Sequence, residues 1–448
     1  MEPIGRLKSA ILAAIAMAFF AGTPDLWADG PQRQITLSDA VRVAILNRPD
    51  IRAQYDRIKS AQARIGEARS ANYPQLQASL QTIYGNSLFG FFLFPGYNYA
   101  DLNLLTVTLT QTIYDFGRTG SVVKKNRWEY SQEEGREKEI LATTVRTVET
   151  DYFRLLSAQH QVIADEQNLE DATAQLDRAR SLFRAGTGIV LDVTRAQVNV
   201  ESTRLQLIRD RDQAQSYGID LDRVMGIPGS KTLVALDVPN DPNFVPHPDL
   251  GKDLSTALQK RPEMIEATDQ VRASEAALEN VKSQNYPSIS GLIQSFTAML
   301  PRNTLPIPYV PNNTPYSTFN FGGSLNIPIL EGGLVVHQIS QAHSDLSASL
   351  ESRRDVKLQV GNDLKKAILE IKDAQQRLKE ARTERMNAQK NEQLVEEAYR
   401  VGSVHSVDVM DAQAAMRQAR ESVIQARYLL MIGYADYQFA RGTLKPPT

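Results

Sequence analysis

The sequence predicts a mainly α-helical protein with a small β part, built from two matching halves. Three observations predict this. One set of motifs occurs twice, the segments 117–184 and 333–400 contain no proline, and four short segments alternate apolar with polar residues. Because proline interrupts helices, the proline-free segments favour long helices, while alternation with a period of two indicates strands.

The duplication sets the organisation of the chain. Ser70-Ala-Asn-Tyr-Pro74 recurs 213 residues later as Ser283-Gln-Asn-Tyr-Pro287, and Phe183-Arg-Ala-Gly186 recurs 216 residues later as Tyr399-Arg-Val-Gly402. The change between the two offsets indicates an insertion in one loop. Each unit is too long for a solenoid repeat, so the pattern predicts a duplicated half-protein with an internal two-fold sequence repeat.

The N-terminus has the features of an export signal. We expect residues 1–28 to form a signal peptide, because Arg6 and Lys8 precede an apolar run at 11–21. That run is shorter than the roughly 20 residues that span a bilayer, and no later segment is long enough. The other boundaries that we expect are 29–230 for the first repeat, 231–250 for a linker, 251–442 for the second repeat and 443–448 for a C-terminal tail.

The net charge argues against one class of protein, and the cysteine content excludes two others. The formal net charge is −2, and the sequence has no cysteine. A near-neutral chain lacks the basic surface that a nucleic-acid partner needs. The absence of cysteine excludes a disulfide framework and a lipid-bearing N-terminal Cys.

In the first half, two short helices are expected before the strands, at 37–46 and 50–72, and Pro74 follows the second helix. Four strands are then expected in the whole chain, as hairpins at about 75–116 and 288–330. Three segments alternate well, at 76–84, 105–113 and 319–329, whereas 288–299 alternates poorly. Each strand is expected to have one apolar and one polar face.

Long helix pairs are expected at 117–225 and 333–441, each turning at a glycine. A helix of about 67 residues would reach ~100 Å, far beyond the three or four turns of an average globular helix. Apolar residues recur every seven positions, which predicts coiled-coil-like packing. These positions are Leu155, Val162, Leu169, Leu176 and Phe183, then Leu364, Ile371 and Leu378, and in the return helices Val193, Val200, Leu207, Val409, Met416, Val423 and Leu430.

One chain cannot cross a membrane by itself, because it has no membrane helix and too few strands for a closed barrel. In lipid, only helices and closed barrels satisfy every backbone polar group. Four strands are too few to close, because membrane barrels begin at about eight strands. Three chains would together supply twelve.

Two pairs of motifs carry a resemblance to a known family. The first pair runs over 183–197 and 399–413, and the second pair is Tyr114-Asp-Phe-Gly117 and Leu330-Glu-Gly-Gly333. With the duplication and the heptads, these motifs make about residues 35–443 resemble the outer membrane efflux proteins, the TolC-like channel family.

The resemblance implies a homotrimer with a trimeric α-barrel in the periplasm and a 12-stranded transmembrane β-barrel among the lipids of the outer membrane. It implies a passive exit duct of a tripartite efflux or type I secretion system, closed by a gate at its periplasmic end. Its substrate would come from an inner-membrane pump or ABC exporter, through a periplasmic adaptor.

The same resemblance assigns a gate to Asp192, Tyr399, Asp408 and Asp411. In a trimer Asp408 and Asp411 would each form a ring of three carboxylates, which favours cations. The resemblance implies that Asp192 and Tyr399 help to hold the tips shut. The alternative is local, because Asp408 can cap a helix N-terminus and Asp411 is favoured by the helix dipole. Val404 departs from the family pattern, where an arginine forms a closing ion pair.

The helix turns are the expected docking sites for the adaptor. Gly186 and Gly402 are expected to cap the helices in a left-handed conformation, which lets the chain reverse. The resemblance adds that these tips, with Thr187 and Ser403, contact the adaptor. At the opposite end, the aromatic segment 88–99 is expected to be a girdle or plug, and the proline-rich segment 301–315 a stiff outer loop.

No enzyme is expected. The five histidines form no HExxH motif and no pair four residues apart, so neither a metal site nor a cofactor is expected. The alternative function is a soluble periplasmic coiled-coil scaffold or adaptor, which would not need apolar strand faces.

Overall fold

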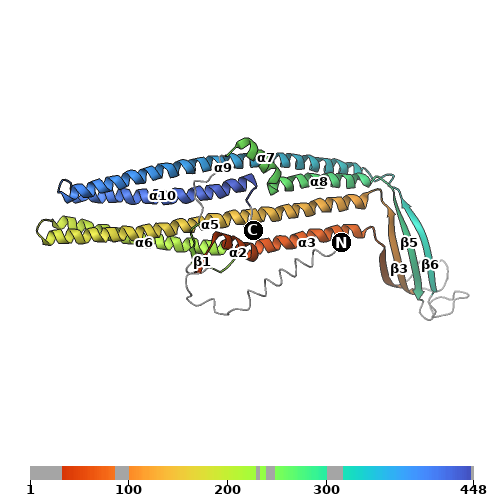
Figure 1. The fold of residues 1–448 in the computed structure, drawn as a ribbon. Coiled ribbons are helices and arrows are strands. Elements are labelled where there is room, and N and C mark those ends of the chain that lie inside the picture. The colour runs from red at the N-terminus through yellow and green to blue at the C-terminus, as the bar shows by residue number, and fades with distance from the viewer. Residues whose placement is uncertain (1–32, 86–99, 229–232, 239–247, 300–315, 445–448) are drawn as a thin grey trace.

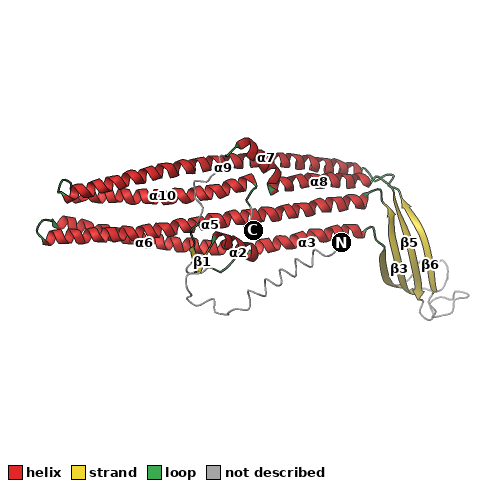
Figure 2. Ribbon diagram, in the orientation of Figure 1, coloured by secondary structure: helices red, strands yellow, loops and turns green. Residues whose placement is uncertain are grey.

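The computed structural model describes residues 33–85, 100–228, 233–238, 248–299 and 316–444. Long helices lie side by side along the molecule, and a sheet extends from one end of them (Figures 1 and 2). The expected signal peptide, both expected outer loops, part of the linker and the last four residues lie outside the described ranges.

The two halves repeat one order of elements. The first half contains β1 (Arg33–Ile35), α2 (Leu37–Asn47), α3 (Pro49–Ser70), β2 (Gln75–Gly85), β3 (Ala100–Tyr114), α5 (Arg118–Arg184) and α6 (Val190–Val224). The second contains β4 (Leu233–Ala235), α7 (Leu250–Lys260), α8 (Pro262–Ser283), β5 (Ser288–Met299), β6 (Tyr316–Asn326), α9 (Leu334–Arg400) and α10 (Ser406–Arg441). The helices α5 and α9 each have 67 residues, as the proline-free segments predict.

The four-stranded sheet is antiparallel in the order β2-β3-β5-β6, so the pairing of β3 with β5 joins the two halves. Its register separates two faces, because directly paired residues share a face. One cross-strand row contains Leu76, Leu109, Ile293 and Phe321, and the adjacent row on the opposite face contains Gln77, Thr108, Gln294 and Asn320. The predicted apolar and polar faces are therefore confirmed for β2, β3 and β6.

Strand β5 is the one whose alternation is weak, yet it pairs along both edges. Its register explains the weak pattern, because Leu292 and Phe296 fall on the polar face and Ser295 on the apolar face. Backbone pairing with β3 and β6 defines this strand more than its side chains do.

A small parallel pair, β1 with β4, was not expected from the sequence. Three-residue strands are too short to show a period. The hydroxyl of the buried Tyr152 on α5 lies 3.0 Å from the carbonyl oxygen of Ile35 and 2.6 Å from that of Leu236, so it fixes both strand ends against the helix.

The shaft is a layer in which α5 and α6 form one hairpin, α9 and α10 form the other, and α10 packs against α5 (Figure 1). The heptad positions Leu155, Leu176, Leu364 and Ile371 are buried, as coiled-coil-like packing requires. Phe183, at the end of its heptad series, is instead exposed at the tip. Within the described ranges, no helix is long and apolar enough to cross a membrane.

In each half, the glycine that follows the last helix lies close to an arginine between the two short helices, Arg48 or Arg261. Gly226 follows α6 with φ of 70°, and a Cβ there would lie 3.1 Å from the backbone nitrogen of Arg48. Gly442 follows α10 with φ of 72°, and a Cβ there would lie 3.0 Å from the backbone nitrogen of Arg261. In both halves the left-handed conformation and the close approach therefore require glycine.

Candidate functional site: the helix tips and the shaft behind them

Gly186 and Gly402 end the long helices in the predicted left-handed conformation, with φ of 75° and 81°. Each tip forms the two backbone hydrogen bonds of a Schellman motif. In the first tip Thr187 N donates to Leu182 O at 3.1 Å and Gly186 N to Phe183 O at 3.1 Å. The second tip makes the matching bonds, from Ser403 N to Ala398 O and from Gly402 N to Tyr399 O, both at 3.0 Å.

The hydroxyl groups after the glycines reinforce these caps. Thr187 Oγ1 donates to Leu182 O at 3.2 Å, and Ser403 Oγ donates to Ala398 O at 2.9 Å. Both side chains are exposed, and both are bonded to their own helix ends. The four expected docking residues therefore lie at the tips with a local structural role.

Asp192 and Asp408 occupy the same position, the third residue of α6 and of α10. Their backbone nitrogens make the same bond, to Ile189 O and to His405 O, each at 3.1 Å. Their side chains differ. Asp408 Oδ2 accepts a hydrogen bond of 2.8 Å from His405 N and so caps its own helix, whereas Asp192 Oδ1 accepts a 2.5 Å bond from Ser406 Oγ of the other hairpin.

Ser406 is a tip residue that the sequence interpretation did not single out. It occupies the place of Val190 in the first repeat, so a hydroxyl stands where the other copy has an apolar side chain. Its bond to Asp192 joins α10 directly to α6. A polar–apolar difference between matched positions is the signal that could have identified it.

The other two expected gate residues are placed at the second tip without a shared contact. Tyr399 is half-buried at the end of α9, and Asp411 is exposed on the first turns of α10. The side-chain partner that the structure gives Asp192 is Ser406, and no hydrogen bond between Asp192 and Tyr399 is found among the described residues. A ring of carboxylates across several chains remains a prediction.

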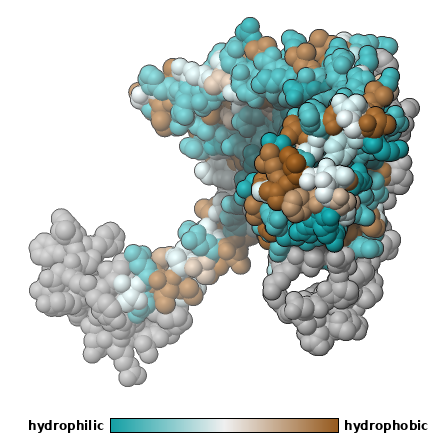
Figure 3. Space-filling view, turned by 90° about the vertical axis from the view of Figure 1, so that its left-hand side faces the viewer, coloured by the Kyte–Doolittle hydropathy of each residue, from teal (hydrophilic) through white to brown (hydrophobic). Residues whose placement is uncertain are grey.

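Apolar side chains are exposed at both tips. Val401 is 80% exposed in the second tip, and Ile189 and Val190 are 58% and 61% exposed in the first. Figure 3, which views the molecule from its tip end, shows hydrophobic residues gathered among hydrophilic ones. Apolar side chains rimmed by polar ones give the tip end a surface suited to contact with another protein.

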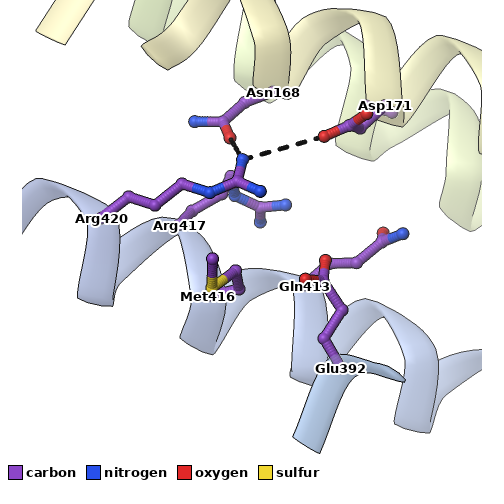
Figure 4. Close-up of a pocket in the computed structure, with 8 residues that line it drawn as sticks. Asn168, Asp171, Glu392, Gln413, Met416, Arg417 and Arg420 are labelled. Carbon is purple, nitrogen blue, oxygen red and sulfur yellow. Dashed lines mark hydrogen bonds and ion pairs between the residues drawn. The ribbon is translucent and has the colours of Figure 1, made fainter. Parts of the chain in front are cut away.

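Behind the tips, a polar layer connects the two hairpins (Figure 4). Arg420 of α10 points toward α5, where Nη1 donates to Asn168 Oδ1 at 3.4 Å and lies 3.9 Å from Asp171 Oδ2. Arg417 of α10 and Glu392 of α9 line the same cavity, whose volume is about 10 Å³. That space is enough for roughly one water molecule.

Burial perturbs the charged groups of this layer. It raises the pKa of Glu392 above its ordinary value, against the opposing effect of Arg420. It also lowers the pKa of Arg417, although Asp165 and Glu392 act in the opposite direction. The sequence interpretation missed the layer, because charged residues on a helix are most often solvated and only the packing of α5, α9 and α10 encloses these.

Within the described ranges, no group of three or more His, Asp or Glu side chains could hold a metal ion. The structure offers hydrogen bonds, charges and apolar surface at the tips and in the shaft.

The model of a family described as outer membrane efflux protein matches residues 40–227 and 254–436, one match in each half. Outer membrane protein TolC of Escherichia coli (strain K12) is 24% identical over 415 residues, which span 91% of this chain and 82% of TolC. Pyoverdine export outer membrane protein OpmQ of Pseudomonas aeruginosa is 23% identical over 404 residues, spanning 87% of this chain and 81% of OpmQ.

A solved structure of CusC has a similar fold. Its TM-score with this chain is 0.79 at 18% sequence identity, and the similarity covers 93% of this chain and 95% of CusC. The predicted class, a mainly α fold with a small β part and a repeat, is therefore confirmed at the level of the single chain.

Proposed function

Because the chain belongs to the outer membrane efflux protein family, and so lies in the outer membrane as an exit duct for efflux, we propose that it works as a homotrimer in a tripartite efflux or type I secretion system. In this proposal substrates enter from an inner-membrane pump or ABC exporter through a periplasmic adaptor. The channel conducts them passively and catalyses no reaction. Residues 1–28 would be removed on export.

The observation that carries the proposal is the sheet. Leu76 is 73% exposed and Phe321 is 82% exposed on the apolar face. The edge strands β2 and β6 each have a partner on one side only within the described sheet. A sheet with a bare apolar face and two open edges is a liability in water but suits a barrel wall that faces lipid.

The two outer helices of the shaft, α6 and α9, also have exposed apolar side chains. On α6, Leu191, Val198 and Leu205 recur every seven residues and are exposed, beside a shallow groove of about 480 Å³. On α9, Leu358 and Leu394 are among the exposed apolar residues. Since α6 and α9 are the outer helices of the layer, α6 of one copy would pack against α9 of the next. Repeated head-to-tail contacts of this kind form a ring.

The name of one relative gives a cargo class to test. OpmQ is named for pyoverdine export.

We propose that the tips, with Gly186, Thr187, Gly402 and Ser403, dock the adaptor, and that Asp192, Tyr399, Asp408 and Asp411 form the gate. Asp192 and Ser406 would hold the two hairpins of one chain together there.

The test of the assembly is its mass and its cellular fraction. The purified, detergent-solubilised protein should have three times the mass of one chain and should be found in the outer-membrane fraction. A stable single-chain particle would contradict the trimer. Recovery in the soluble periplasm would favour the scaffold alternative.

The test of the gate is ion selectivity in planar bilayers. The double variant Asp408→Ala, Asp411→Ala should have higher conductance or lower preference for cations, because two carboxylates per chain are removed. Unchanged conductance and selectivity would argue that Asp408 serves as a cap only.

The test of docking is the variant Gly402→Trp, which should weaken adaptor binding while trimers persist. Loss of trimers would indicate a role in capping alone.

A further inference from the structure

A buried carboxyl group in the shaft lacks a donor for one of its oxygens. Asp165 of α5 is 4% exposed, and its Oδ1 accepts hydrogen bonds from Gln161 Nε2 and Asn168 Nδ2, both at 3.2 Å. No described group donates to its Oδ2. Leaving a buried carboxylate oxygen unsatisfied is costly, so something else must satisfy it.

The neighbour of Asp165 on α6 is a second carboxyl group, that of Asp210. Two carboxylates cannot bond to each other, because both only accept, but one shared proton makes a strong hydrogen bond between them. The structure thus supplies the place for a proton between α5 and α6.

A cation lies on the other side of Asp165. Arg417 of α10 is close enough to interact electrostatically with both Asp165 and Glu392 of α9. Asn168, which donates to Asp165, also accepts from Arg420 of α10. Asp165 is therefore placed between a carboxyl group of its own hairpin and the arginines of the other.

We propose that Asp165 is a proton-operated latch of the shaft: when protonated it bonds to Asp210 within the first hairpin, and when ionised it holds Arg417 and so ties the first hairpin to the second. Loss of the proton adds repulsion between α5 and α6 and attraction between α5 and α10. Acidification reverses both, leaving Arg417 with Glu392 on its own hairpin and loosening the contact between hairpins.

The electrostatic surroundings of Asp165, Arg211 and Glu392 are consistent with this latch. Burial, followed by the carboxyl group of Asp210, raises the pKa of Asp165 to about 7. On α6, Arg211 next to Asp210 is already paired with Glu166 of α5 at 2.7 Å. On α9, Glu392 faces the two arginines of α10, with Glu396 nearby.

The sign of the stability change follows from this pKa. An unfolded aspartate loses its proton near pH ~3.9. The folded chain keeps the proton of Asp165 up to about pH 7, so it binds more protons than the unfolded chain between these values. The contribution of Asp165 to stability therefore falls as pH rises through this window and levels off above it.

The experiment measures the separation of the hairpins against pH. The chain has no native cysteine, so spin labels can be attached at Ala174→Cys on α5 and Gln418→Cys on α10, both exposed positions. Full-length labelled chains, diluted with unlabelled chains, are measured by pulsed electron paramagnetic resonance in detergent. The distance distribution should broaden and lengthen as pH falls from 8.5 to 5.5, with a midpoint near 7.

Variants separate the latch from general acid effects. Asp165→Asn should show the acid distribution at every pH, and Asp210→Asn should move the midpoint to lower pH, because the neighbouring charge is gone. Asp177→Asn, an exposed carboxyl closer to the tip on α5, should leave the midpoint unchanged. A distribution independent of pH in the unsubstituted chain, or an unmoved midpoint in Asp210→Asn, would overturn the proposal.

Discussion

The two helix tips have the same backbone and different side-chain partners. Both turn at a left-handed glycine with matching Schellman bonds, but Gly188 stands where the other tip has Val404, and Val190 where it has Ser406. Asp408 caps its own helix, while Asp192 reaches across to the other hairpin. The two copies of the repeat therefore share one backbone turn, while the matched side chains around it make different contacts.

The largest expected difference between the tips concerns Gly188. A Cβ there would lie 2.9 Å from the backbone nitrogen of Phe183, so Gly188→Val should destabilise the first tip by about 1–3 kcal/mol. Val404→Gly in the second tip should cost only about 0.5–1 kcal/mol in chain flexibility. Hydrogen exchange of the tip amides measures both. Equal destabilisation by the two substitutions would mean that the two loops have the same backbone conformation.

The capping glycines should behave alike. A Cβ at Gly186 or Gly402 meets nothing within 4 Å, so alanine is disfavoured by the left-handed backbone alone, at roughly 1–2 kcal/mol. Thermal unfolding and tip exchange rates should therefore change equally in Gly186→Ala and Gly402→Ala. A large difference between them would break the equivalence of the two turns.

The matched aspartates should differ in where their loss is felt. Asp408→Ala should fray the first turn of α10 by about 1 kcal/mol, because it removes the cap on His405 N. Asp192→Ala should leave the start of α6 less affected and should instead weaken the contact between the hairpins. Exchange rates at the two helix starts distinguish these outcomes, and fraying of both starts to the same degree would contradict the assignment.

The smallest expected effect belongs to the hydroxyl that distinguishes the tips. Ser406→Ala removes one side-chain bond and should cost about 0.5–1 kcal/mol, felt, as in Asp192→Ala, as a weaker contact between the hairpins rather than as fraying of one helix start. Val190→Ser places a hydroxyl in the matched position of the first tip. If that hydroxyl draws Asp408 away from His405, exchange of the His405 amide will rise; if the cap persists, the tips differ in geometry as well as in residue type.

Periodic local features were predictable from the sequence, whereas contacts between distant segments were not. Seven-residue spacing and strand alternation located α5, α9 and three of the four sheet strands, because both depend on local geometry. Strand β5 was the weak case, since its partners lie in other parts of the chain. The tip glycines were identified from their repeat, but the bond from Ser406 to Asp192 and the burial of Asp165 arise only when separate helices pack.

The central pairing of the sheet has a consequence for how the protein is made. Gln294 Nε2 lies 3.4 Å from Thr108 Oγ1, although the two residues are 186 positions apart. Closing so long a loop is slow, and β3 emerges from the ribosome long before its partner β5 exists. The nascent β2–β3 hairpin therefore waits with a bare apolar face, so we expect a chaperone to shield it until the second half arrives.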